Sequence, residues 1–271
     1  MVDGMDRYGD VTVATTGDHV ATVTIDRPPD NYFDTELIGS IADAYEALEA
    51  AKDCRAIVLR SEGRNFCAGA ALGRGAGPDA GSSGVERTTI GQGGRHLYDE
   101  AIRLFAAGLP VVAAVQGAAI GGGLGLALSA DFRVGAAESR MSANFARLGF
   151  HHGFALTVTL PPVVGQQRAL ELLLTGARLS GSEAHSIGLL DRLVARDDVE
   201  AAAHALAAEV ALSAPLAVAS IRRTMRDGLV GRVRAATERE KAQQARLTGT
   251  HDFAEGIRAM AERRTPDFEG R

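Results

Sequence analysis

Long apolar runs are absent from this chain of 271 residues, in which no stretch reaches eighteen consecutive apolar residues. Because a helix needs about twenty such residues to cross a bilayer, we expect no membrane span and no membrane partner. The opening residues, MVDGMDRYGD, also lack the basic start and apolar centre of a secretory signal. These absences predict a cytoplasmic protein.

An excess of positive charge is also missing. The 29 Lys and Arg residues are outnumbered by 34 Asp and Glu, which gives a net charge of -5, and both signs are interspersed. Without a basic stripe, we expect no nucleic acid partner.

Cysteine is scarce, with only Cys54 and Cys67, and both stand in apolar surroundings. Two such residues in a cytoplasmic chain are typical of buried small hydrophobic side chains rather than of a disulfide or a metal site. No cluster of His, Cys, Asp and Glu has metal-ligand spacing, so we predict no metal.

Hydrophobic periodicity predicts strands and one helix in the first part of the chain. Residues 11–25 alternate on both sides of a Thr-Gly-Asp turn, which is typical of a β-hairpin. Asp34 can cap a helix over residues 35–51, whose apolar side chains recur on one face. Continuous apolar runs, typical of strands buried on both sides, follow at 56–60, 111–115 and 132–136. Strands alternating with helices predict an α/β fold with a parallel sheet.

The second part of the chain is helical in pattern from about residue 154. Helices are predicted over 165–175, 197–212, 214–228, 229–248 and 251–263. We expect residues 1–200 to form the core and residues 201–271 a C-terminal helical oligomerisation region. Residues 73–94 are rich in Gly and Ser, and we expect a mobile loop there, beside the site.

A run of glycines marks the first candidate site. Residues 117–131 read GAAIGGGLGLALSAD, with Gly121, Gly122 and Gly123 at the start of a predicted short helix and Gly125 inside it. Amides at a helix N-terminus have no intrahelical partner, so without side chains in the way they can hold an anion or a developing oxyanion. Tight turns and close packing also explain such runs.

A second small-residue turn, GRNFCAGAAL (residues 63–72), follows the predicted strand 56–60. Ligands of open α/β sheets sit at the C-terminal ends of strands, where two such turns supply two convergent amides. The sequence therefore favours a backbone oxyanion hole built from both turns.

Four segments carry a family resemblance: NFCAGA, AAVQGAAIGGGLGLALSADFRV, LLLTGARLSGSEAHSIGLLDRLV and DFAEGIRAMAERRTPDFEG. In order and spacing they resemble the motifs of the crotonase (enoyl-CoA hydratase/isomerase) superfamily. The resemblance implies a crotonase-like spiral of ββα repeats with a C-terminal helical trimerisation region. It also implies an acyl-CoA thioester as ligand, with coenzyme A as part of the substrate and no separate cofactor, and a homotrimer or a dimer of trimers.

The resemblance also implies roles for individual residues. The oxyanion hole would be formed by the backbone amides of Ala68 and Gly122. The backbone around Ala70 and Leu72 would face the adenine of CoA. Arg27 lies where the family often has a basic residue near the CoA phosphates, and an ordinary surface arginine is the alternative.

Hydratases of the family use two glutamates, and neither has a counterpart in this chain. The matching positions are Gly125 and Phe145, both of which would line the acyl site. Since hydration needs titratable groups beside the reacting carbons, we expect an acyl-CoA enzyme that is not an efficient standard hydratase. The alternative is a protein that binds acyl-CoA without transforming it.

Replacement acid/base groups can be sought near these positions. His151 and His152, beside Gly153, stand where the family has a turn that lines the acyl pocket, and histidine transfers protons readily near pH 7. The alternative is that the pair caps the next helix or bonds to the backbone. Weaker candidates for this role, or for a nucleophile in the case of the cysteine, are Glu86, His96, Tyr98, Asp99, Glu100 and Cys67.

Overall fold

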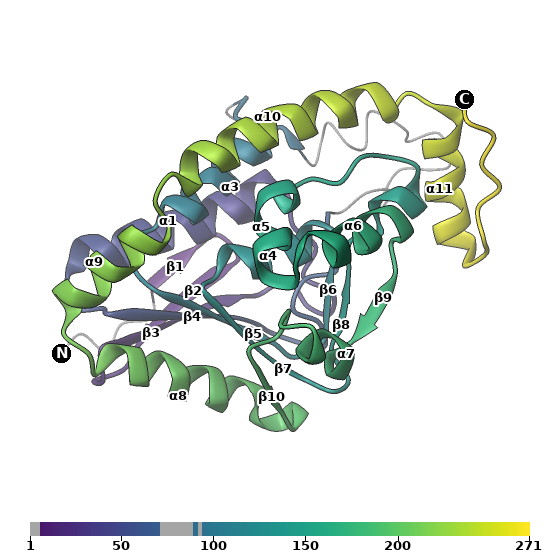
Figure 1. Ribbon diagram of the computed structural model, residues 1–271. Coiled ribbons are helices and arrows are strands. Elements are labelled where there is room, and N and C mark those ends of the chain that lie inside the picture. Colours follow the sequence, from purple (N-terminus) through teal and green to yellow (C-terminus); the bar gives the residue numbers. More distant parts are fainter. Residues whose placement is uncertain (1–5, 71–88, 92–93) are drawn as a thin grey trace.

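The computed structural model describes residues 6–70, 89–91 and 94–271. Its main sheet has seven strands in the order β1-β2-β3-β4-β5-β7-β10 (Figure 1). These strands are β1 (Asp6–Tyr8), β2 (Val11–Thr15), β3 (Val20–Ile25), β4 (Ala56–Ser61), β5 (Val111–Val115), β7 (Phe132–Ala136) and β10 (Arg192–Val194). The first three pair antiparallel, and every pair from β3 onward is parallel. The predicted hairpin and the three predicted buried strands are confirmed.

A second sheet lies beside the first and has three strands, in the order β6-β8-β9. They are β6 (Ala118–Ile120), β8 (Arg140–Ser142) and β9 (Arg178–Ser180). Three residues are too few to show a period of two, so the sequence pattern did not predict them. The turn after β4 joins this sheet, because the Cys67 amide donates to the Ala118 carbonyl at 2.8 Å.

The helices predicted from the sequence are all present. They are α1 (Thr35–Ala51), α3 (Leu97–Ala106), α4 (Gly122–Ser129), α5 (Leu156–Val164), α6 (Gln166–Thr175), α7 (Gly181–Ser186), α8 (Val199–Ala211), α9 (Pro215–Met225), α10 (Leu229–Leu247) and α11 (His251–Glu262), with 3-10 turns η1 (Asn144–Leu148) and η2 (Arg196–Asp198). Asp34 caps α1 as predicted, accepting a hydrogen bond from the Leu37 amide at 2.9 Å. Residues 71–88 and 92–93, most of the predicted loop, lie outside the described residues.

Helices cover both faces of the main sheet. Helices α1, α3 and α4 pack on one face, and α8 packs on the other (Figure 1). Small side chains of α8, Ala203 and Ala207, lie against Val58 and Val112 of the sheet. The expected division at residue 200 falls inside α8 and stays a prediction.

Helix α11 packs against η1 at two glycines. A Cβ added to Gly149 would lie 2.5 Å from the Asp252 carbonyl oxygen, and one on Gly256 would lie 2.5 Å from the Leu148 carbonyl carbon. The two backbones therefore approach more closely than side chains would allow. This contact brings the C-terminal helix to the edge of the cavity described below.

In the described part of the chain, no single helix is long and apolar enough to cross a bilayer. One pair of segments reaches that length and composition only when taken together, Arg196–Ala211 with Pro215–Met225, and the pair is bent by 105° at the break between them.

Candidate active site

A cavity of about 520 Å³ lies where the turn after β4 meets the N-terminus of α4. Both predicted turns line it, through the backbone at residues 68–70 and 121–122. Its apolar wall is mostly aromatic, with Phe33, Phe145, Phe150 and Phe154. The structure thus brings the two turns together around one concave site, as the sequence predicted.

The amide of Gly122 is free to meet a ligand. Gly121, with φ of 57°, donates its own N–H to the Ser142 carbonyl at 2.8 Å and accepts from Leu124 at 3.1 Å. Gly122 is the first residue of α4, and among the described residues its N–H has no acceptor. At a helix N-terminus that lines a cavity, such an N–H attracts negative charge.

The prediction that the Ala68 amide is the second donor is wrong. Its N–H already donates to the Asp30 carbonyl at 2.9 Å. The N–H of Ala70, which also lines the cavity, has no acceptor in the described part of the chain. The Gly69 N–H also has no acceptor among the described residues, so the free amides on this turn are those of Gly69 and Ala70.

Gly69 determines where the Ala70 amide points. The Gly69 carbonyl accepts from the Phe33 amide at 3.0 Å, and a trans peptide directs the next N–H to the opposite side. That side is the one where Cys67 pairs with β6, which leads into Gly121 and Gly122. Gly69 has φ of 101°, a conformation that other residues rarely adopt. Gly69 was therefore the signal in the sequence that could have identified Ala70 as the second donor, and sequence reasoning missed it.

Phe145 lines the cavity as predicted, whereas Gly125 does not. A Cβ on Gly125 would lie 2.5 Å from Cβ of Phe154, so the Phe154 side chain fills the space beside α4. Phe145 lines the cavity and packs on Phe150 with ring centroids 5.4 Å apart. Among the described residues that line the cavity, none is a carboxylate or a histidine.

The two histidines lie outside the cavity lining. His152 Nε2 is 2.9 Å from Thr157 Oγ1, and His151 Nδ1 is 2.7 Å from the His152 carbonyl oxygen. Burial, with a smaller effect from His151, lowers the pKa of His152 to about 4. This geometry matches the alternative in which the pair bonds locally. It gives no support to His152 or His151 as the replacement acid/base.

Tyr98 is the candidate from the 86–100 segment that does reach the cavity. Its hydroxyl donates to Gln244 Oε1 at 2.8 Å, and Gln244 Nε2 donates to the His151 carbonyl at 3.0 Å. A Cβ on Gly153 would lie 1.9 Å from the Tyr98 hydroxyl oxygen, so only glycine leaves room for this link. Burial raises the pKa of Tyr98, which keeps the phenol protonated. Gln244 also lines the cavity, and sequence reasoning missed it.

The other candidates have structural roles or lie outside the described residues. His96 and Asp99 form the capping box of α3, and the buried Glu100 pairs with Arg103 at 2.6 Å. Burial raises the pKa of the Cys67 thiol to about 12, which removes its nucleophilic form at neutral pH. Glu86 and Leu72 fall outside the described part of the chain.

Three arginines that could meet a CoA ester differ in whether a carboxylate pairs with them. Arg27 is held by Asp10 and Asp34, at 2.5 and 2.8 Å, and does not line the cavity, so its predicted contact with CoA phosphates is not supported. Arg178 and Arg263 do line the cavity, and neither has a carboxylate partner among the described residues. Both stand in segments that carry the resemblance, but no spacing in the sequence distinguishes them from other arginines.

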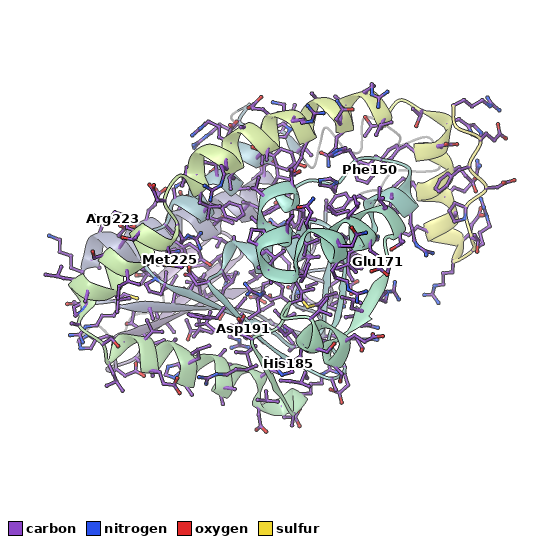
Figure 2. All side chains as sticks on the ribbon, viewed as in Figure 1. Phe150, Glu171, His185, Asp191, Arg223 and Met225 are labelled. Carbon is purple, nitrogen blue, oxygen red and sulfur yellow. The ribbon has the colours of Figure 1, made fainter. Side chains whose placement is uncertain are left out.

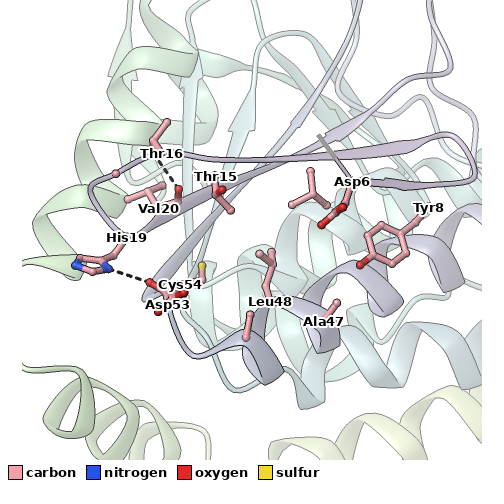
Figure 3. Close-up of a pocket in the computed structure, with 13 residues that line it drawn as sticks. Asp6, Tyr8, Thr15, Thr16, His19, Val20, Ala47, Leu48, Asp53 and Cys54 are labelled. Carbon is pink, nitrogen blue, oxygen red and sulfur yellow. Dashed lines mark hydrogen bonds between the residues drawn. The ribbon is translucent and has the colours of Figure 1, made fainter. Parts of the chain in front are cut away.

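A second cavity, of about 500 Å³, lies between β1, β2, β3 and α1 (Figure 3). There His19 Nδ1 lies 2.9 Å from the Asp53 carbonyl oxygen, over an apolar floor that includes Leu48. It is lined by neither glycine turn, so it is not the candidate active site. No group of three His, Cys, Asp or Glu side chains in the described ranges is placed to hold a metal ion.

Comparison with known proteins shows the family of this chain. Residues 15–271 match the family model described as enoyl-CoA hydratase/isomerase. A probable enoyl-CoA hydratase of Bacillus subtilis is 31% identical over 93% of this chain and 95% of the relative. The 1,2-epoxyphenylacetyl-CoA isomerase of Escherichia coli is 30% identical over the same shares. An enoyl-CoA hydratase/isomerase structure from Pseudoalteromonas atlantica superposes with a TM-score of 0.83, at 29% identity, over 96% of this chain and 100% of that one.

The chain belongs to the enoyl-CoA hydratase/isomerase family, the crotonase superfamily, and has its mixed α/β fold with a helical C-terminal region. Proteins of this family act on acyl-CoA thioesters.

Proposed function

We propose that this chain is an acyl-CoA enzyme that binds the thioester carbonyl oxygen between the amides of Ala70 and Gly122. The observation that carries the proposal is that both N–H groups line one cavity and lack acceptors in the described part of the chain. Reactions next to a thioester place negative charge on that oxygen, and a well-placed donor lowers such a barrier by about 2.7 to 4 kcal/mol.

The lining argues against efficient standard hydration. Adding water across a double bond needs an acid and a base beside the reacting carbons, and the described lining has neither a carboxylate nor a histidine. The named relatives include both a hydratase and an isomerase, so the family alone does not select one reaction. The unpaired Arg178 and Arg263 suit the anionic part of a CoA ester.

A non-catalytic acyl-CoA-binding role is the second candidate function. The same lack of titratable groups in the described lining favours it. Turnover separates the two candidates: an enzyme converts some member of an acyl-CoA panel, whereas a binding protein holds the esters unchanged.

Infrared spectroscopy of a bound thioester tests the oxyanion hole without requiring turnover. With 13C-labelled carbonyl in butyryl-CoA, we expect the C=O stretch to move to lower wavenumber in the complex than in water. Gly122→Ala places a Cβ 2.3 Å from Cζ of Phe33, and we expect binding about tenfold weaker or more, with the stretch shift lost.

Gly231→Ala is the matched control, because its Cβ would meet nothing within 4 Å on α10. It should leave both the affinity and the stretch unchanged. No affinity of the wild type for CoA esters, or an unshifted stretch in the complex, would contradict the proposed function.

We also propose that the chain assembles as a homotrimer or a dimer of trimers through α9. No residue of α9 is buried, and its apolar side chains Leu216, Ile221 and Met225 are 86%, 63% and 79% exposed. Met225 is labelled in Figure 2. Exposed apolar surface of this kind is typical of an interface. By light scattering after size exclusion, we expect three or six chains for the wild type and monomers for Ile221→Asp.

Ala205→Asp, at an exposed position of α8, is the control and should leave the assembly intact. A wild type that stays monomeric at tens of micromolar would overturn the proposed assembly.

A further inference from the structure

Two aromatic pairs face the Gly121–Gly122 turn. A Cβ on Gly121 would lie 3.6 Å from Cζ of Phe145, whereas one on Gly122 would lie 2.3 Å from Cζ of Phe33 and 3.6 Å from Cδ2 of Phe154. Phe33 packs on Phe154 with ring centroids 5.5 Å apart, and Phe145 packs on Phe150. No ring contact joins the two pairs in the described part of the chain. Both pairs line the same cavity.

The position of Phe154 is fixed by its backbone. Phe154 and Ala155 both have left-handed conformations, with φ of 58° and 61°, which non-glycine residues seldom adopt. The buried Glu240 carboxylate of α10 holds the segment, accepting from the Ala155 amide at 2.9 Å and the Thr157 amide at 3.2 Å. Over-determined backbone of this kind clusters at ligand sites.

Phe154 also takes the place that a side chain at position 125 would occupy. Its Cβ lies 2.5 Å, and its Cγ 2.8 Å, from where a Cβ on Gly125 would stand. The surface beside the Gly122 amide is therefore a phenyl ring held against α4. We therefore expect an acyl group whose carbonyl oxygen reaches the Gly122 amide to contact Phe154 on one side and Phe145 on the other.

We propose that Phe145 and Phe154 form a slot that selects a planar, apolar acyl group, specifically an aryl-bearing one, next to the thioester. The inference depends on the proposed function, because it assumes a thioester carbonyl at Gly122. Aromatic rings gain from ring-ring contact beyond the area that they bury, whereas a saturated ring of equal carbon number is thicker and lacks the quadrupole. Phe145 and Phe154 are thus specificity-determining residues.

Isothermal titration calorimetry with two matched thioesters tests the slot. Phenylacetyl-CoA and cyclohexylacetyl-CoA have the same carbon skeleton, and only the first has a flat ring. We expect the wild type to bind phenylacetyl-CoA about threefold to tenfold more tightly. Phe154→Leu should remove most of this preference, and Phe145→Leu should reduce it. Phe268→Leu, a partly exposed ring that does not line the cavity, should keep it.

The outcomes separate the two proposals. Equal binding of the two thioesters to the wild type, or an unchanged preference in both Phe154→Leu and Phe145→Leu, would overturn the slot while leaving the oxyanion hole standing. If neither thioester binds but butyryl-CoA does, the slot alone is overturned; if none of the three esters binds, the proposed function falls as well. If Phe154→Leu does not fold, as judged by thermal unfolding, Phe145→Leu decides.

Discussion

Gly125→Glu is expected to destabilise the protein by at least about 3 kcal/mol and to give no hydratase turnover. The new Cβ would lie 2.5 Å from Cβ of Phe154, and position 125 is buried, so the carboxylate would lose its hydration. Overpacking alone costs about 1 to 3 kcal/mol, and an unpaired buried charge adds to it. Urea unfolding at pH 7 measures the free energy, and loss of crotonyl-CoA absorbance measures hydration.

Gly231→Glu makes the same chemical change on α10, where a Cβ meets nothing within 4 Å. Because an exposed helical glycine is costly, this control should alter stability by no more than about 1 kcal/mol, in the stabilising direction. A Gly125→Glu protein as stable as the wild type would contradict the fixed position of Phe154. Hydration by that variant would show that position 125 can still hold a catalytic carboxylate.

Much of the architecture could be predicted because it follows local periodicity. The continuous apolar strands β4, β5 and β7, and the α1 cap at Asp34, each depend on a few neighbouring residues. Strands β6, β8 and β9 are three residues long, and their pairing depends on contacts far along the chain. Nothing in so short a segment distinguishes a strand from a loop.

The candidate site was predictable to the level of its turns but not of its atoms. Glycines at 121 and 122 indicated a free helix N-terminus, which the structure has. The choice between Ala68 and Ala70 depends on Asp30, whose carbonyl takes the Ala68 amide, and on the turn at Gly69. Such a competition between backbone acceptors is set by tertiary contacts.

The position of Phe154 in the cavity wall was harder still to predict from the sequence. Phe154 in a left-handed conformation has no signature in the sequence, since phenylalanine normally avoids that region. It is held there by Glu240, which follows Ala155 by 85 positions along the chain. A pattern within a helix-sized window does not connect the two residues.

Glu240→Ala is expected to cost about 1 to 3 kcal/mol of unfolding free energy. The carboxylate, 1% exposed, accepts from the Ala155 amide, the Thr157 amide and the Thr157 hydroxyl, the last at 2.6 Å. Removing it leaves the buried Ala155 amide without an acceptor, at about 1 to 3 kcal/mol, whereas the exposed Thr157 can bond to water instead. Urea unfolding measures the loss, and Glu238→Ala, at an exposed position of the same helix, should change stability by less than about 0.5 kcal/mol.

The pH dependence of Glu240 has a definite sign. Burial raises the pKa of Glu240 above its ordinary value, against the opposing hydrogen bonds from Thr157 and Ala155, so the folded state holds this proton more tightly than the unfolded state. The contribution of Glu240 to the free energy of unfolding is full below its pKa in the unfolded state. It declines as the pH rises through its pKa in the folded state. Compared with Glu240→Gln, which does not titrate there, the wild type should therefore lose stability as pH rises from 4 to 8. If the wild type instead gains stability relative to Glu240→Gln as the pH rises, the three hydrogen-bond donors outweigh the loss of hydration. The folded state then favours the charged carboxylate.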